Sequence, residues 1–110
     1  MDKAHKKLSA WQKAIVLAKL VYEATAVLPP TEKFGLTSQM RRAAVSIPSN
    51  IAEGAARKGR KESIWFYTIS RASLSELDTQ IELCHVLGFV NPSHDTRLIA
   101  QVDTVDSLLS

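Results

Sequence analysis

The spacing of apolar and small residues between positions 61 and 87 constrains the fold more than any other feature of the sequence. Over three repeats they occupy the same two positions of a seven-residue pattern. They are Tyr67, Ser70, Leu74, Leu77, Ile81 and Cys84. Such a pattern places one stripe of side chains along a helix and favours packing against other helices. We therefore predict a long helix from about Lys61 to Leu87, ended by Gly88 as the first residue beyond it.

Three more segments have helical spacing. We expect helices from about Ser9 to Leu28, from Leu36 to the region of Gly54, and from Pro92 towards the end of the chain. Pro29 and Pro30 should end the first of these, because proline disfavours helical backbone before it and lacks a donor. Asn91 followed by proline is typical of a helix start. With no strand-like alternation, the sequence predicts an all-α, antiparallel up-down four-helix bundle, residues 1–110 forming one domain.

The first and third of these helices carry apolar residues on more than one face. The expected stripe of the first helix consists of Trp11, Ile15, Ala18 and Tyr22, with Leu17, Leu20, Val21 and Ala24 beside it. In the third helix, four apolar residues lie outside the seven-residue pattern: Ile64, Phe66, Ile69 and Val86. We predict that both helices bury a second face, which favours self-association. Trp11 and Trp65 are expected in the core or at an interface rather than stacked on bases.

Pro48 lies inside the apolar pattern of the second segment. It cannot donate a hydrogen bond to the carbonyl of Ala44, so the helix should either kink or restart there. A restarted helix would be capped by Asn50, and a kinked one could use neighbouring serine hydroxyls to satisfy the freed backbone groups. The residues themselves leave both alternatives open.

Composition excludes several classes of protein. The 110 residues allow one domain, and 45% hydrophobic residues are too many for a disordered chain. A single Cys84 excludes an internal disulfide framework and a cysteine-rich zinc site. The three histidines lie in different segments, so we expect no metal, no cofactor and no enzymatic activity. No signal peptide or membrane-spanning run is evident, which predicts a cytoplasmic protein that does not contact membranes.

Positive charge is concentrated in the first part of the chain. Residues 1–61 contain 12 Lys and Arg against 4 Asp and Glu, whereas residues 62–110 contain 2 against 7. The densest group, Arg57, Lys58, Arg60 and Lys61, falls at a predicted helix–helix connection. It could bind phosphates, dock on the acidic last third of a neighbouring chain, or simply be solvated. It is not a nucleotide-binding phosphate loop, because a helix precedes it and an arginine replaces the required lysine.

Arg41 and Arg42 form a second basic pair on the predicted second helix. One alternative is that one of them points inward and bonds to a helix end or a buried carboxylate. The other is that the pair contacts phosphate.

The block from Phe34 to Gly54, with RRAAVSIPSNIAEG at its centre, resembles a known family. Ser73 to Gln80 and Leu87 to Phe89 resemble its third-helix signature, and the match extends from about Trp11 to Val90. This is the four-helix bundle family of proteins encoded in intervening sequences of bacterial large-subunit ribosomal RNA genes, also labelled an S23 ribosomal protein family. The resemblance implies that Pro48 is internal to the second helix.

The resemblance also implies assembly and partners. Relatives form cylindrical homopentamers, and a related branch is the accessory protein of diversity-generating retroelements, which binds nucleic acid and a reverse transcriptase. We therefore expect a non-enzymatic, self-associating bundle, with a homopentamer the expected assembly. RNA or DNA and a reverse transcriptase are the expected partners. The alternative is a protein-interaction scaffold with no nucleic-acid role.

Overall fold

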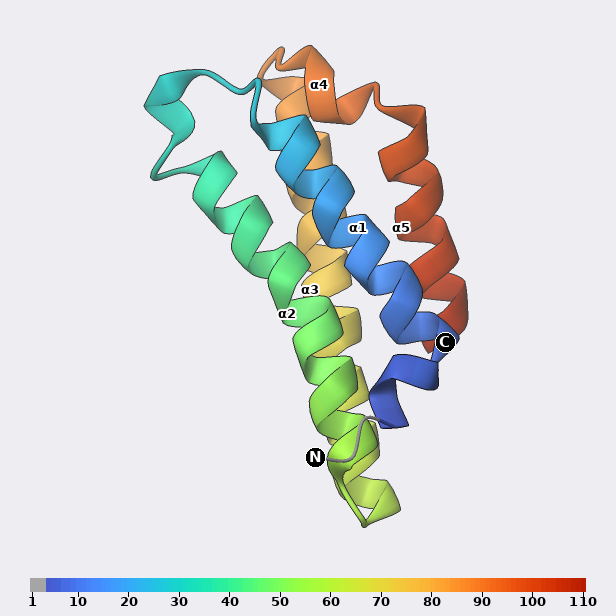
Figure 1. Cartoon of the computed structure of the whole chain (residues 1–110). Coiled ribbons are helices and arrows are strands. Elements are labelled where there is room, and N and C mark those ends of the chain that lie inside the picture. The colour runs from blue at the N-terminus through green and yellow to red at the C-terminus, as the bar shows by residue number, and fades with distance from the viewer. Residues whose placement is uncertain (1–3) are drawn as a thin grey trace.

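Four long helices run alternately up and down the molecule (Figure 1). The computed structural model describes residues 4–110. Its helices are η1 Ala4–Lys7, α1 Ser9–Thr25, η2 Pro30–Glu32, α2 Leu36–Ala56, α3 Arg60–Val86, α4 Val90–Ser93 and α5 Thr96–Leu109. α1 packs between α2 and α5, α2 packs along α3, and α3 contacts α5 less extensively. The predicted antiparallel four-helix bundle is confirmed.

The core is formed by one apolar stripe from each long helix. Leu77 and Cys84 of the seven-residue pattern are fully buried, and Leu74 and Ile81 are nearly so. Other large, fully buried side chains come from the remaining helices: Leu17, Val21, Met40, Ile47, Ile51, Leu98 and Val105. The pattern predicted on the third helix therefore faces the core, as expected for a bundle seam.

The core face of α1 differs from the prediction. Ala14, Leu17, Val21 and Ala24 face the core. Of the stripe that we expected there, Trp11 and Ala18 are half-buried, while Ile15 and Tyr22 are each 44% exposed. Both stripes have helical spacing, and α2 and α5 cover only one of them. The helix also ends at Thr25 rather than near Leu28.

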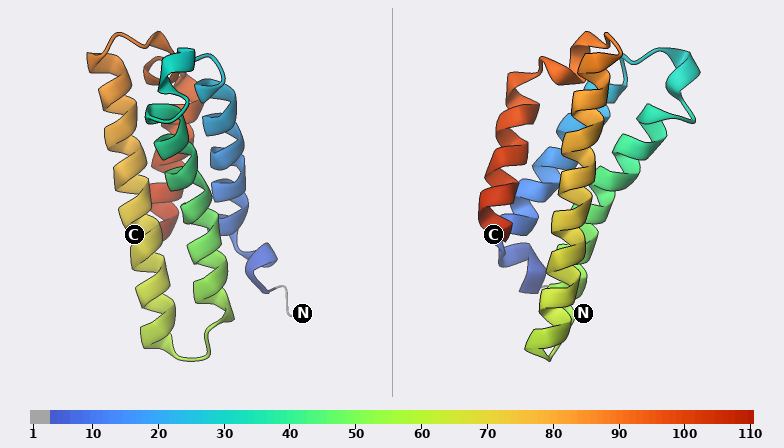
Figure 2. Two further views of the ribbon diagram at one scale, coloured as in Figure 1. Left: turned by 90° about the vertical axis from the view of Figure 1, so that its left-hand side faces the viewer. Right: turned by 180° about the vertical axis from the view of Figure 1, so that it is seen from behind.

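A second buried face on α3 is likewise absent within the chain. Ile64 and Val86 are exposed, and Phe66 and Ile69 are half-buried. The start of α3, with Ile64, projects beyond α1 and α5 and is not covered by them (Figure 2). Val86, at the other end of α3, borders an open depression with Ile99 of α5.

α2 continues through Pro48 without a restart. Asn50 does not cap a new helix; its side-chain amide donates to the backbone oxygen of Ser46 at 2.8 Å. The Ser49 hydroxyl donates to the carbonyl of Val45 at 2.7 Å, and the Ser70 hydroxyl of α3 donates to that of Ile47 at 2.9 Å. Side chains thus supply donors around the proline, and the internal position of Pro48 is confirmed.

The ends of α3 and α5 are set by local chemistry. Gly88 has a φ of +81°, and its N–H donates to His85 while that of Phe89 donates to Cys84. This is the Schellman motif expected of a C′ glycine. The last long helix does not begin at Asn91 and Pro92, which lie within the single-turn α4. It begins at Thr96, because the Asp95 carboxylate accepts hydrogen bonds from the backbone N–H groups of Arg97 and Leu98.

Candidate functional site

The α2–α3 hairpin projects past the other two long helices. α2 has 21 residues and α3 has 27, against 17 for α1 and 14 for α5. Figures 1 and 2 show the connection between α2 and α3 as the far end of the molecule, beyond the ends of α1 and α5. We call Arg57, Lys58, Arg60 and Lys61 at this end the basic turn. All four residues are exposed.

The basic turn is held in place by tight packing one turn below it. A Cβ at Gly54 would lie 2.6 Å from the ring of Tyr67, so only glycine allows α3 to approach α2 this closely. The Ser63 hydroxyl donates to the Gly54 carbonyl at 2.8 Å, and the Arg57 N–H donates to the same carbonyl at 3.2 Å. These contacts connect the end of α2 to the start of α3 across a short loop.

The four cations of the basic turn differ in how far they are neutralised. Arg57 pairs with Glu53 at 2.8 Å and lies over the ring of Phe66, 4.6 Å from its centroid. Within residues 4–110, no ion pair involves Lys58, Arg60 or Lys61. Three free cations at a projecting end give a local excess of positive charge, which attracts phosphate.

Arg41 and Arg42 lie elsewhere and have different surroundings. Arg41 donates to the Thr25 hydroxyl at 2.9 Å and to the Tyr22 carbonyl at 3.2 Å, and it lies over the Tyr22 ring. Of the two alternatives, a structural bond or a phosphate contact, Arg41 therefore makes the structural one, to the C-terminal end of α1. Arg42 is exposed and lines a depression with Ser46, Ser73 and Glu76.

The structure does not bring the six predicted site residues together. Arg42 and Arg57 are separated by 15 positions on α2, roughly 22 Å along the helix axis. The nucleic-acid site predicted from the sequence therefore divides into the basic turn and a separate pair, one member of which is engaged with α1.

Trp65 lies beside the basic turn, and of the two positions predicted for it the core is contradicted, while an interface with another molecule stays a prediction. It is 64% exposed and belongs neither to the core nor to a helix contact within the chain. With Ile64 it lines a shallow depression that Arg57 and Lys61 also border. The available signal was its position in the second turn of α3, directly after the basic turn and four residues from Lys61.

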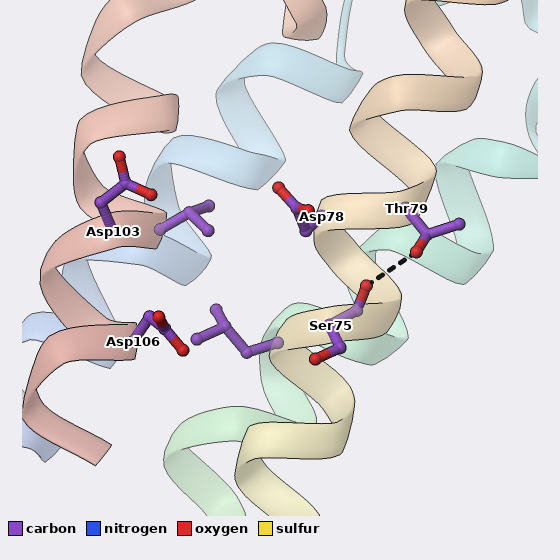
Figure 3. A pocket seen from close by; sticks show the side chains of 7 residues that line it. Ser75, Asp78, Thr79, Asp103 and Asp106 are labelled. Carbon is purple, nitrogen blue, oxygen red and sulfur yellow. Dashed lines mark hydrogen bonds between the residues drawn. The ribbon is translucent and has the colours of Figure 1, made fainter. Parts of the chain in front are cut away.

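An acidic depression lies between α3 and α5, away from the hairpin end. Figure 3 shows Asp78 of α3 facing Asp103 and Asp106 of α5 across this gap. Thr79 donates to the backbone oxygen of Ser75 at its edge, 2.9 Å away. Among the residues that the structure describes, no three His, Cys, Asp or Glu side chains are grouped so that they could hold a metal ion.

Cys84 lacks the surroundings of a nucleophile. Its side chain is fully buried against Met40, with the two sulfur atoms 3.8 Å apart. Burial, with a smaller contribution from the charge of Glu32, raises the pKa of the Cys84 thiol above its ordinary value. Its neighbour His85 points elsewhere, towards the ring of His94. A buried, protonated thiol packs as a small apolar group.

Fold and surface together define a helical bundle with a projecting basic hairpin. The family model described as 23S rRNA-intervening sequence protein matches residues 6–110. The chain belongs to this family. Comparison with curated proteins gives no significant match. Over the described part of the chain, no helix has both the length and the hydropathy needed to cross a bilayer.

Proposed function

We propose that the protein is a non-enzymatic, self-associating helical bundle that binds RNA or DNA through phosphate contacts at the basic turn. The observation that carries this proposal is the exposure of Lys58, Arg60 and Lys61 at the projecting end of the hairpin without a carboxylate partner in residues 4–110. Cations already paired to protein carboxylates gain little from a phosphate, whereas free ones can replace the counterions of a nucleic acid.

Self-association would multiply this weak contact. One basic turn offers three or four phosphate contacts, so a single chain should bind weakly. An oligomer presents the same turn once per subunit, and each bound turn raises the effective concentration of the next. Membership of the family favours a homopentamer as this assembly. A reverse transcriptase as a partner stays a prediction from the resemblance.

The test is fluorescence anisotropy with labelled RNA and labelled DNA at two salt concentrations. We expect nearly sequence-independent binding, with the logarithm of the association constant falling by ~2 to 4 per bound basic turn for each tenfold rise in salt. Replacing Arg57, Lys58, Arg60 and Lys61 by Gln should abolish it. The matched control replaces four exposed cations outside the basic turn by Gln, namely Lys13, Lys19, Lys33 and Arg97. Both variants lose four positive charges. A difference in their affinity for nucleic acid would therefore show that binding depends on the basic turn and not on net charge.

The second candidate function is a protein-interaction scaffold, favoured by the acidic depression between α3 and α5. Its carboxylates could receive the basic turn of a neighbouring subunit. In that case the wild type would not bind nucleic acid even at low salt. The Gln variant of the basic turn would then lose its oligomeric size in sedimentation, which the nucleic-acid proposal does not predict.

A further inference from the structure

Trp65 exposes an aromatic face beside the cations of the basic turn. Its exposed fraction is 64%, and that of Ile64 is 51%. Both line the depression that Arg57 and Lys61 border. Leaving an indole ring in water forgoes the stabilisation that burial of a large apolar side chain provides. Folding within this chain therefore does not explain the position of Trp65.

Helix geometry places a cation next to each exposed apolar side chain. Arg60 precedes Ile64 by four positions, and Lys61 precedes Trp65 by four, so each pair is adjacent on the surface of α3. Arg57, held over the Phe66 ring, closes the other side of the depression. Cations thus lie beside apolar and aromatic side chains on one surface at the start of α3.

We propose that Trp65 is a stacking platform for an unpaired base, and that the basic turn therefore binds single-stranded nucleic acid more tightly than the duplex. This inference rests on the proposed function, which it narrows to one class of ligand. Aromatic side chains in basic grooves stack on bases without regard to sequence, because every base has a π face. In a duplex both faces of an internal base are already stacked on neighbouring bases. A duplex can therefore contact this surface of the protein only through its phosphates.

One carboxylate on the same surface should oppose binding. Glu62 lines the depression and has no ion-pair partner within residues 4–110. It lies next to the path of a phosphate backbone that reaches from Lys61 to Trp65. Glu62→Gln should therefore raise the affinity for single-stranded RNA, whereas loss of the Trp65 ring should lower it.

The experiment compares a labelled single-stranded RNA with the duplex that it forms with its complement. Trp65→Ala should weaken binding of the single strand roughly 5- to 150-fold, the effect of losing one stacked base. It should leave duplex binding and the salt dependence unchanged, because no charge is removed. Trp65→Phe should restore much of the affinity. Phe34→Ala is the matched control, since Phe34 is 89% exposed beside Lys33 at the opposite end of α2.

Tryptophan emission gives a second, independent readout. In a Trp11→Phe variant all tryptophan emission comes from Trp65, and single-stranded RNA should quench it. In a Trp65→Phe variant the remaining Trp11 should respond little, because it is half-buried against η1, with its ring near His5.

The outcomes separate the two proposals. If the wild type binds neither RNA at low salt, the proposed function fails and this inference fails with it. If the wild type binds both RNAs and Trp65→Ala changes neither, the basic turn binds phosphate but the stacking platform is overturned. If Trp65→Ala instead changes the sedimenting size of the protein, Trp65 contacts a second copy of the chain, which also overturns the inference.

Discussion

Gly54 determines how closely the two helices of the projecting hairpin approach. The position is helical and buried, and its backbone needs no positive φ. What requires glycine is the space, because the Tyr67 ring and the Ser63 carbonyl occupy the volume that a Cβ would need. The Ser63 and Ser70 hydroxyls then bond across the same gap to carbonyls of α2. One missing methyl group therefore sets the geometry that presents the basic turn.

Gly54→Ala should lower the free energy of unfolding. Its Cβ would lie 2.6 Å from the Tyr67 ring and 3.1 Å from the Ser63 backbone oxygen, so the helices must separate. Overpacking of this kind costs ~1–3 kcal/mol, partly offset by ~1 kcal/mol of better helix propensity. Urea unfolding measures the difference. The control is Gly59→Ala, where a Cβ would contact nothing within 4 Å. Equal stability of the two variants would contradict this account.

At the scale of the element, a single residue sets the end of α3 and another sets the start of α5. Gly88 closes α3 through its left-handed conformation, and Asp95 opens α5 through its carboxylate. By contrast, the N-cap residues of α1, α2 and α3 make no side-chain hydrogen bond, although the Glu32 carboxylate accepts from the first N–H of α2 at 3.1 Å. Among the four long helices, α5 alone has an N-cap side chain that accepts from its backbone, so its start should be the most sensitive to substitution of the cap.

Asp95→Ala should destabilise the protein by ~0.5–2 kcal/mol, because two backbone N–H groups lose the acceptor that lies 3.0 and 3.1 Å away. Asn91→Ala should have almost no effect, although the sequence made Asn91 the expected cap. Thermal unfolding followed by circular dichroism compares the two. A larger loss for Asn91→Ala than for Asp95→Ala would mean that α5 starts elsewhere.

At the scale of the whole molecule, two of the depressions away from the hairpin end are bordered by exposed apolar side chains. Tyr22, Phe34 and Val45 border one depression. Leu83, Val86 and Ile99 border another, between α3 and α5 near α4. Clusters of exposed apolar residues are typical of surfaces that contact another protein. The second faces that α1 and α3 do not bury within the chain are thus exposed on its surface.

The protein should sediment as an oligomer in dilute buffer, and its size should not decrease as salt is raised. Apolar contacts are not screened by ions, whereas docking of the basic turn on the acidic depression would be. Sedimentation equilibrium at low and high salt measures both properties. A monomer of 12.1 kDa at tens of micromolar would contradict the prediction. Dissociation by salt would assign the assembly to charge pairing instead.

The helical spacing of apolar residues and the residues that end helices were sufficient to predict most of the fold. The seven-residue pattern of α3 faces the core as predicted, because helix geometry alone brings Leu74, Leu77 and Ile81 to one side. Gly88 ends α3 as predicted, since its role depends only on neighbouring backbone. Asp95 was missed because Asn91 followed by proline is also a typical signal for a helix start, but Asn91 has extended backbone inside the single-turn α4 and does not start α5.

Tertiary structure decided which helix faces are buried and which distant side chains meet, because the helical spacing left both open. α1 has two apolar stripes of equal quality, and the positions of α2 and α5 select the one containing Leu17 and Val21. Arg41 reaches Thr25 and Tyr22 only because α2 returns alongside α1, which no local pattern encodes. Trp65 is exposed because the hairpin extends past its neighbours. The sequence thus determined which segments are helices and where most of them end, through interactions within a few residues. Which faces are buried depended on contacts between segments distant in the chain.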